Sequence, residues 1–325
     1  MKVIKKLLAP LIVVGLLLTS LLTLHQLKSS KKANVKRIGI SQYITHKSLD
    51  ATRDGFIEEL AKAGYVNGKN IEIDLQNAQG EQRNLKNISK NLSESSDLIF
   101  AIATPSAQSL VNTTKTVPIL FSAVTDPLGA KLVSDLQKPG GNVTGTSDQS
   151  STAISTQVDL IKKVKPTAQT IGILYTQSEP NSVVQKDEIK AILNSKGFTV
   201  VEKTILDSNN VKAAADSLMS EVDMVFVPTD NIISSTMETI KQLSIKHQVP
   251  VFGGSTEMVN IGGLYNYGTD YTELGRQSAR MAIRILEGES PSDLAVELPE
   301  TIELHVNKEM ADALNIDVTT LTVEN

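Results

Sequence analysis

Val117-Pro-Ile-Leu-Phe-Ser122 recurs in this chain as Val249-Pro-Val-Phe-Gly-Gly254, 132 residues later. Two further stretches also occur twice and in the same order: Arg37-Ile-Gly-Ile40 returns as Thr170-Ile-Gly-Ile173, and Asp97-Leu-Ile-Phe-Ala-Ile-Ala-Thr104 returns as Asp223-Met-Val-Phe-Val-Pro-Thr229. Their offsets are 133 and 126 residues, so the chain carries an internal repeat with a period of about 130 residues. Three collinear matches favour a duplicated architecture over chance, and we expect two similar lobes.

Each repeated stretch contains a short apolar run, and such runs alternate with amphipathic stretches along the body of the chain. The runs are four to six residues of mostly Val, Ile, Leu and Phe, as expected of parallel strands covered on both faces. Between them, residues such as Leu85, Ile88 and Leu92 recur at helical spacing. The alternation predicts an α/β fold with two parallel-sheet lobes and a central cleft. Ligands of such sheets bind beyond the carboxyl ends of the strands, so the cleft is the expected site.

The charges of the chain are divided unequally. Residues 1–37 hold eight Lys and Arg and no acid, which leaves 24 basic against 36 acidic residues for 38–325. A body with a net charge of about −12 is a poor match for a phosphate backbone, so nucleic acid is not an expected partner. The chain has no cysteine, which excludes disulfides, thiolate metal sites, thiol nucleophiles and a lipid-modified cysteine anchor.

Residues 1–36 are typical of an export segment followed by a short polar tether. An uncharged run of 18 residues, Leu7 to Leu24, follows three lysines and precedes five more basic residues. At ~1.5 Å per residue it covers ~27 Å, close to the ~30 Å hydrocarbon core of a bilayer. Because Leu18-Thr19-Ser20 makes a poor cleavage site, we favour an uncleaved signal anchor over a cleaved signal peptide or a buried core helix. The body is then expected at the extracellular face of the cytoplasmic membrane, anchored by residues 7–24, or secreted after cleavage.

Two loops at predicted strand ends carry residues that suit an amino acid. Thr104-Pro105-Ser106 begins a helix, whose free N–H groups and hydroxyls accommodate a carboxylate. Pro228-Thr229-Asp230-Asn231 takes the equivalent place in the second repeat, where Asp230 would face an ammonium. We therefore treat Thr104, Ser106 and Asp230 as candidate ligand contacts, although helix capping alone explains each of them equally well.

Further polar residues and glycines lie near strand ends in both repeats and complete the predicted site. They are Gln42, Ser122, Asp126, Thr146, Asn181, Ser182, Asn231, Gly254 and Ser255. None of them is specific alone: Asp126 before a proline is first of all a candidate helix cap, and Gly254 brings backbone amides close to a ligand. Their clustering at the strand ends carries the prediction.

Chemistry on the ligand is not expected. The four histidines, at 25, 46, 247 and 305, show no metal spacing and are interpreted as structural. The sequence also lacks a Gly-x-Ser-x-Gly elbow, a phosphate-cradling loop and a dinucleotide fingerprint after the first strand. We predict a binding protein without a cofactor or a metal, and not an enzyme.

Several longer motifs point to one family. They are Ile38-Gly-Ile-Ser-Gln42, Gly64-Tyr-Val-Asn-Gly-Lys-Asn70, Gln76-Asn-Ala-Gln-Gly80, Ala103-Thr-Pro-Ser-Ala-Gln108, Val124-Thr-Asp-Pro127, Lys138-Pro-Gly-Gly-Asn-Val-Thr-Gly145, Val227-Pro-Thr-Asp-Asn231 and Val251-Phe-Gly-Gly-Ser-Thr-Glu-Met258. With them, residues 37–315 resemble the extracytoplasmic solute-binding proteins of ABC importers of the aromatic amino-acid type, close to tryptophan- and tyrosine-binding members of Gram-positive bacteria. Many relatives begin with a lipidation cysteine, and here the apolar segment stands in for it.

The resemblance implies a periplasmic-binding-protein fold with three interlobe crossings, near residues 146, 255 and 290. Lobe 1 would comprise 37–146 with about 256–290, and lobe 2 would comprise 147–255 with about 291–325. A helix from about Tyr271 to Leu286 would rejoin lobe 1, and a strand near Thr301 to Val306 would rejoin lobe 2.

The resemblance also implies a monomeric receptor that closes its lobes on an aromatic amino acid, with tryptophan the first choice, and delivers it to an ABC permease. Thr104, Ser106 and Ser122 would bind the carboxylate and Asp230 the ammonium. The aromatic residues that can either stack on the ligand or pack in the core are Tyr43, Phe121, Tyr175, Tyr265 and Tyr267. The alternatives are a receptor for a sugar or another small solute, and a sensory module coupled to a membrane receptor.

Overall fold

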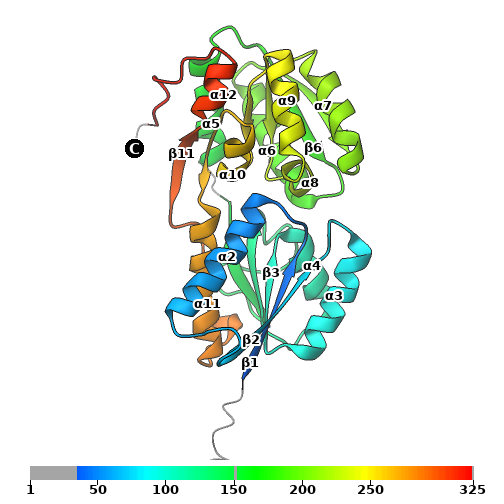
Figure 1. Cartoon of the computed structure of the whole chain (residues 1–325), viewed down its shortest axis with the longest axis vertical. Helices are drawn as coiled ribbons and strands as arrows, with labels where there is room; N and C mark the ends of the chain where they lie inside the picture. The colour runs from blue at the N-terminus through cyan, green and yellow to red at the C-terminus, as the bar shows by residue number, and fades with distance from the viewer. Residues whose placement is uncertain (1–34, 150–151, 324–325) are drawn as a thin grey trace, which may run out of the picture.

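The computed structural model describes residues 35–149 and 152–323, which form two α/β lobes, one above the other in Figure 1. The two-lobed fold predicted from the repeat is confirmed. The predicted signal anchor or signal peptide lies outside the described residues and stays a prediction. Among the helices within 35–149 and 152–323, none combines the length and the apolar character needed to cross a bilayer.

Lobe 1 is built on a five-stranded parallel sheet in the order β2-β1-β3-β4-β5. Its strands are β1 (Lys36–Gln42), β2 (Ile71–Asn77), β3 (Leu98–Ile102), β4 (Ile119–Val124) and β5 (Val143–Ser147). Its helices are α2 (Lys47–Lys62), α3 (Gln82–Ser95), α4 (Thr104–Thr113) and α11 (Tyr271–Leu286). Helices α2 and α11 cover one face of the sheet, and α3 and α4 cover the other (Figure 1).

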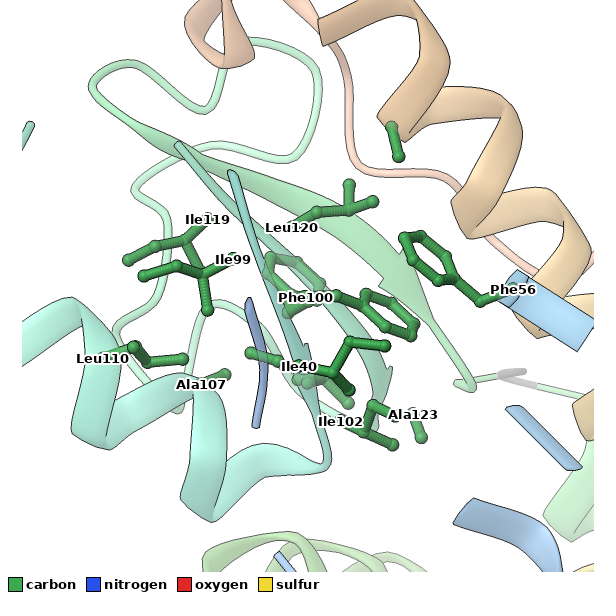
Figure 2. Close-up of a cluster of buried hydrophobic side chains, with 14 of the residues drawn as sticks. Ile40, Phe56, Ile99, Phe100, Ile102, Ala107, Leu110, Ile119, Leu120 and Ala123 are labelled. Carbon is green, nitrogen blue, oxygen red and sulfur yellow. The ribbon is translucent and has the colours of Figure 1, made fainter. Parts of the chain in front are cut away.

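The packing of α2 on α11 depends on two glycines. A Cβ on Gly55 would lie 2.2 Å from the carbonyl oxygen of Thr272, and a Cβ on Gly275 would lie 2.0 Å from that of Thr52. No side chain fits at either place, so the two helix backbones lie in direct contact. Phe56, next to Gly55, turns toward the sheet and stacks on the buried Phe100, with ring centroids 3.9 Å apart (Figure 2). Helix α2 is thereby fixed both to the sheet and to α11.

Lobe 2 contains a six-stranded sheet in the order β11-β10-β9-β8-β6-β7, in which β11 alone runs antiparallel to its neighbour. Its strands are β6 (Thr170–Thr176), β7 (Thr199–Ile205), β8 (Met224–Val227), β9 (Val251–Gly253), β10 (Tyr265–Thr269) and β11 (Ile302–Val306). Its helices are α5 (Ala153–Val164), α6 (Pro180–Ser195), α7 (Val211–Met219), α8 (Asn231–Ser234), α9 (Met237–His247), α10 (Thr256–Ile261) and α12 (Lys308–Ala313). Two 3-10 turns complete the described elements, η1 (Ser208–Asn210) in lobe 2 and η2 (Pro291–Asp293) beside lobe 1.

The repeated stretches occupy equivalent strands of the two sheets. Strands β1, β3 and β4 of lobe 1 correspond to β6, β8 and β9 of lobe 2, since the orders β2-β1-β3-β4 and β7-β6-β8-β9 match. The repeated glycine is used alike in both: a Cβ on Gly39 or Gly172 would lie 2.9 Å from the side chain of Leu92 or Leu218. One covering helix in each lobe, α3 or α7, therefore packs directly on its sheet at this glycine.

The chain crosses between the lobes three times, but two crossings lie further along than predicted. The first lies between β5 and α5, as expected. The second is at Asp270, between β10 and α11, because α10 and β10 still belong to the sheet layer of lobe 2. The third precedes β11, because Leu294 and Val296 pack in the core of lobe 1 and Glu297 pairs with Thr146 of β5. Residues 256–269 thus belong to lobe 2 and 291–297 to lobe 1, which corrects the predicted boundaries.

Candidate ligand-binding site

Two pockets lie between the lobes and meet at four shared residues. Pocket 1 spans about 300 Å³ and pocket 2 about 490 Å³, and both volumes include space that is open to solvent. Both are lined by Thr125, Asp148, Thr229 and Tyr271. Thr125 and Tyr271 come from lobe 1, Thr229 comes from lobe 2, and Asp148 lies on the first crossing. The two pockets therefore adjoin each other between the lobes.

Pocket 1 is lined mainly by polar side chains. Its other lining residues are His46, Ser48, Leu49, Ala123, Asn181, Asn231, Ser234, Ser255 and Met258. The amino end of α2 opens into it, and the first bond within that helix runs from the N–H of Asp50 to the carbonyl of His46 (3.0 Å). The N–H groups before Asp50 have no helical acceptor, and no side chain caps them. Because a helix amino end carries partial positive charge, this end of the cleft favours an anion.

Three hydrogen-bonded pairs join the lobes around the cleft. They are His46 Nε2 with Asn231 Oδ1 at 3.1 Å, Ser48 Oγ with Ser255 Oγ at 2.6 Å, and Thr125 Oγ1 with Thr229 Oγ1 at 3.2 Å. Burial lowers the pKa of His46 to about 4, so its ring is neutral at pH 7 and Nε2 donates to Asn231. The lobes are thus held together at this edge by uncharged groups.

Asp148 brings a carboxylate to the junction of the two pockets. Its Oδ2 accepts a hydrogen bond from the hydroxyl of Tyr271 at 2.7 Å, whereas its Oδ1 is buried and has no hydrogen-bond partner among the residues that the structure describes. Burial raises the pKa of Asp148, and the hydroxyls of Tyr271 and Thr125 oppose the rise. A buried carboxylate oxygen with no donor costs free energy, so this position favours a cation or a donor supplied by a ligand.

Pocket 2 combines aromatic and apolar walls with a group of amide and carboxyl side chains. Its residues beyond the shared four are Gln149, Ala153, Ile154, Gln157, Gln185, Glu188, Phe226, Gly254, Tyr267, Gly268 and Thr269. Of the aromatic residues considered in the sequence, Tyr267 lines this pocket and is half-buried. Phe121 instead lies in the core of lobe 1, and Tyr265 stacks on Phe252 with ring centroids 5.3 Å apart. Tyr43 and Tyr175 line neither pocket.

Asp230, predicted to face an ammonium, is fully buried inside lobe 2 and lines neither pocket. Its carboxylate accepts four hydrogen bonds, from the N–H and the hydroxyl of Thr176, the hydroxyl of Ser182 and the N–H of Ile233. The last of these caps α8. Ser182, also predicted to touch the ligand, is used by Asp230 in this way. Both residues hold the carboxyl end of β6 to the amino ends of α6 and α8.

Glu179 lies next to Asp230 and organises the lobe 2 wall of pocket 1. Its Oε2 accepts hydrogen bonds from the side-chain amide of Asn181 (3.1 Å) and from both the N–H (3.1 Å) and the side-chain amide (2.5 Å) of Asn231. Its Oε1 accepts from the N–H of Ile232 (3.1 Å). Burial, and then the charge of Asp230, raise the pKa of Glu179 to about 8. These bonds fix Asn181 and Asn231, both of which line pocket 1.

Four other residues of the predicted site bond within lobe 1. The hydroxyls of Ser122 and Thr146 lie 2.9 Å apart, and Thr146 continues to Ser278 of α11 at 2.8 Å. The amide of Gln42 bonds to α2 and to the loop before it. Asp126 accepts a backbone N–H of its own turn, which is the capping role weighed for it in the sequence. None of the four lines pocket 1 or pocket 2.

The hydroxyls of Thr104 and Ser106 are buried at the amino end of α4 and have no hydrogen-bond partner in the described part of the chain. They line neither pocket, but α4 adjoins the wall of pocket 1. The N–H of Ala103 donates to the carbonyl of Ser122 (3.0 Å), and the next residue, Ala123, lines pocket 1. Ala103 and Ala123 have φ of 79° and 55°, a left-handed conformation that costs non-glycine residues energy and often marks functional sites.

The structure thus brings together part of the predicted site and adds residues that the sequence argument did not select. Asn181, Asn231 and Ser255 line pocket 1, and Gly254 lines pocket 2. The main addition is Asp148. Its position at the predicted first crossing could have identified it from the sequence as a candidate site residue, because a crossing faces both lobes. Within residues 35–149 and 152–323, no group of three or more His, Cys, Asp or Glu side chains is arranged to hold a metal ion.

Known proteins resemble this chain along most of its length. A family model described as ABC transporter substrate binding protein matches residues 37–323. The tyrosine-binding protein of Clostridioides difficile (strain R20291) is 40% identical over 332 residues, which cover 99% of this chain and 95% of that protein.

Two solved structures are also similar to this chain over most of its length. The crystal structure of an ABC domain in complex with L-Trp from Streptococcus pneumonia is 37% identical, with a TM-score of 0.83 over 88% of this chain and 96% of that chain. The ligand-free, open structure of a substrate binding protein with adhesive properties from Clostridium difficile is 42% identical, yet its TM-score is 0.67 over 88% of this chain and 97% of that chain. The more identical of the two proteins is therefore the one that superposes less well on this chain.

Proposed function

This chain belongs to the family of ABC transporter substrate binding proteins, and on that premise we propose that it binds an aromatic amino acid between its two lobes. The observation that carries the proposal is Asp148, a buried carboxylate with a free oxygen, which lies where a polar pocket and a larger, partly aromatic pocket meet. An aromatic amino acid has a matching group for each of these parts: an ammonium for Asp148, a carboxylate for the polar pocket and a ring for the larger pocket. The relatives named for tyrosine and containing L-Trp support this ligand class.

The ammonium of the ligand is assigned to Asp148. Its free Oδ1 accepts one N–H of the ammonium, while Oδ2 keeps its bond from Tyr271. The hydroxyls of Thr125 and Thr229, which line both pockets from opposite lobes, are within the same part of the cleft. A cation at this point compensates a carboxylate that burial otherwise makes costly to ionise.

The carboxylate of the ligand is assigned to pocket 1. There it meets the free N–H groups at the amino end of α2 and the hydroxyls of Ser48 and Ser255. The amino end of α4, with the unpartnered hydroxyls of Thr104 and Ser106, adjoins the same wall and remains part of the proposed anion site. The ring then occupies pocket 2, against Tyr267 and Ile154.

Binding and closure are linked in this arrangement. Pocket 1 is lined from lobe 1 by α2 and from lobe 2 by the loops that end at Asn231 and Ser255, so it exists as a pocket when the lobes meet. A ligand favours the closed state through contacts that both lobes make in that state and not in the open one. No chemical step on the ligand is part of this function.

Calorimetric titration with a set of matched ligands tests the proposal. L-tyrosine and L-tryptophan are expected to bind, whereas tyramine, which lacks the carboxylate, and indole-3-propanoate, which lacks the ammonium, are expected to bind at least tenfold more weakly. Leucine and myo-inositol serve as controls for a small apolar side chain and for a polyol. Binding of myo-inositol without binding of either aromatic amino acid would reject the function.

Two further parts of the function extend from the family and the amino-terminal sequence. The receptor delivers its ligand to an ABC permease as a monomer, which uptake of labelled tyrosine by cells with and without the gene can test. Residues 7–24 hold it at the outer face of the cytoplasmic membrane, which the intact mass of the protein extracted from membranes can test. A mature mass that lacks residues 1–36 together with release into the medium would replace the anchor by a cleaved signal peptide.

A further inference from the structure

Gln157 of α5 places a buried acceptor in pocket 2 that no residue within 35–149 and 152–323 satisfies. The residue is 4% exposed, and its side-chain Nε2 donates to the backbone carbonyl of Tyr267 at 3.1 Å. Its Oε1 has no hydrogen-bond partner. A buried amide oxygen without a donor is unusual, because leaving such a group unpaired costs free energy.

The hydrogen-bond partners of this side-chain amide determine which of its two ends is the nitrogen. The atom facing the carbonyl of Tyr267 must be the nitrogen, since a carbonyl accepts and cannot donate. The backbone of the same residue is held as well, because the hydroxyl of Tyr265 donates to the carbonyl of Gln157 at 2.9 Å. The free Oε1 is therefore a fixed feature of the pocket wall.

The neighbouring polar groups at this part of pocket 2 do not supply a donor to Oε1. Gln185 accepts the N–H of Thr229 at 2.8 Å through its own Oε1. Glu188 adds a half-buried carboxyl, whose pKa burial raises. Thr269 adds a buried hydroxyl that is itself without a partner. This part of the pocket is lined by α5, α6 and β10, and Glu188 and the free Oε1 of Gln157 are acceptors there.

We infer that Gln157 selects ligands whose ring carries an N–H or O–H donor, so that phenols and indoles are accepted and a plain phenyl ring is disfavoured. The inference rests on the proposed function, since it requires the ring to enter pocket 2. A donor on the ring satisfies Oε1, whereas phenylalanine covers the same oxygen and leaves it unpaired. Sites built to hydrogen-bond a ligand group discriminate strongly against the analogue that lacks it.

The preference between tyrosine and phenylalanine is the quantity to measure, because the two differ only in the ring hydroxyl. In the unaltered protein, tyrosine or tryptophan is expected to bind roughly ten- to a hundredfold more tightly than phenylalanine. In Gln157→Leu, the Tyr/Phe and Trp/Phe affinity ratios are expected to fall toward one, with phenylalanine affinity kept or improved. Any effect of losing the bond to Tyr267 falls on all three ligands alike and cancels in the ratios, so the ratios isolate the role of Oε1.

The control is Gln177→Leu, the same substitution at an exposed position that lines neither pocket. It should keep the ratios of the unaltered protein. If Gln157→Leu does not fold, the ratio in the unaltered protein still decides. Equal binding of phenylalanine there, or an equal loss for all three ligands in the variant, overturns the inference while the proposed function stands. Failure of all three to bind the unaltered protein overturns the function itself.

Discussion

Replacing Asp148 by asparagine tests the proposed ammonium site without removing the side chain that the fold uses. The asparagine oxygen can still accept the hydroxyl of Tyr271, which lies 2.7 Å from Oδ2. The amide NH₂ then takes the place of the free Oδ1, so a donor faces the ligand's own donors. The variant therefore loses one charge-assisted hydrogen bond, worth about 1.5 to 3 kcal/mol. L-tryptophan affinity should fall by about ten- to a hundredfold.

The assay can use the ligand's own fluorescence, because the chain contains no tryptophan and every indole signal comes from the ligand. L-tryptophan and indole-3-propanoate are titrated in parallel, since the second compound lacks only the ammonium. Compared with the unaltered protein, Asp148→Asn should bind L-tryptophan more weakly. It should bind indole-3-propanoate as tightly or more tightly. The improvement is expected because the substitution removes a buried charge that the deaminated ligand cannot compensate.

The matched control is Asp126→Asn, the same change at a carboxylate that bonds to its own turn and lines neither pocket. Its affinities should equal those of the unaltered protein. The reasoning fails if Asp148→Asn binds L-tryptophan undiminished. It also fails if both indoles lose affinity by the same factor, because the carboxylate would then act through the fold and not through the ammonium.

Three other substitutions follow from the packing and the charges. Gly275→Ala should lower the free energy of unfolding in urea by about 1 to 3 kcal/mol, because its Cβ would lie 2.0 Å from the Thr52 carbonyl oxygen; an unchanged midpoint would contradict the close approach. Asp230→Asn should lower thermal stability and change L-tryptophan affinity less than Asp148→Asn does, because four donors of its own lobe surround that carboxylate; the reverse order would restore it as a ligand contact. His46 is neutral in the closed state, with a pKa lowered to about 4, so ligand affinity should be full above pH ~6.5 and fall by up to about tenfold per unit toward pH 4. His46→Gln should make this fall shallower, because Asp148, whose pKa burial raises, and Glu179, whose pKa is raised to about 8, titrate in both proteins; identical pH profiles would exclude His46 as a source.

The lobes and most strands followed from the sequence because buried parallel strands are uninterrupted apolar runs. The second crossing did not, because β10 reads Tyr-Asn-Tyr-Gly-Thr and shows no such run, so the boundary was placed before it instead of after it. The third was missed because Leu294 and Val296 bury their side chains in lobe 1 without forming a strand there.

The site was predictable as a place but not residue by residue. Loops at strand ends line the cleft, as expected, and they include Asn181, Asn231, Gly254 and Ser255. The choice between Asp148 and Asp230 depends on how many donors surround each carboxylate, and the donors of Asp230 come from residues 48 and 54 positions away as well as from its own turn. Such a satisfied carboxylate and a free one look alike in a sequence.

The bond between Asp148 and Tyr271 has a consequence for how a receptor of this shape is triggered. Asp148 lies on the first interlobe crossing, and Tyr271 begins α11 directly after the second. Their bond therefore connects two of the three interlobe crossings. A ligand whose ammonium is bound at these crossings moves little relative to either lobe while the lobes close. Binding of the ammonium can then precede closure of the lobes, and the contact of the ring with Gln157 determines how stable the closed state is.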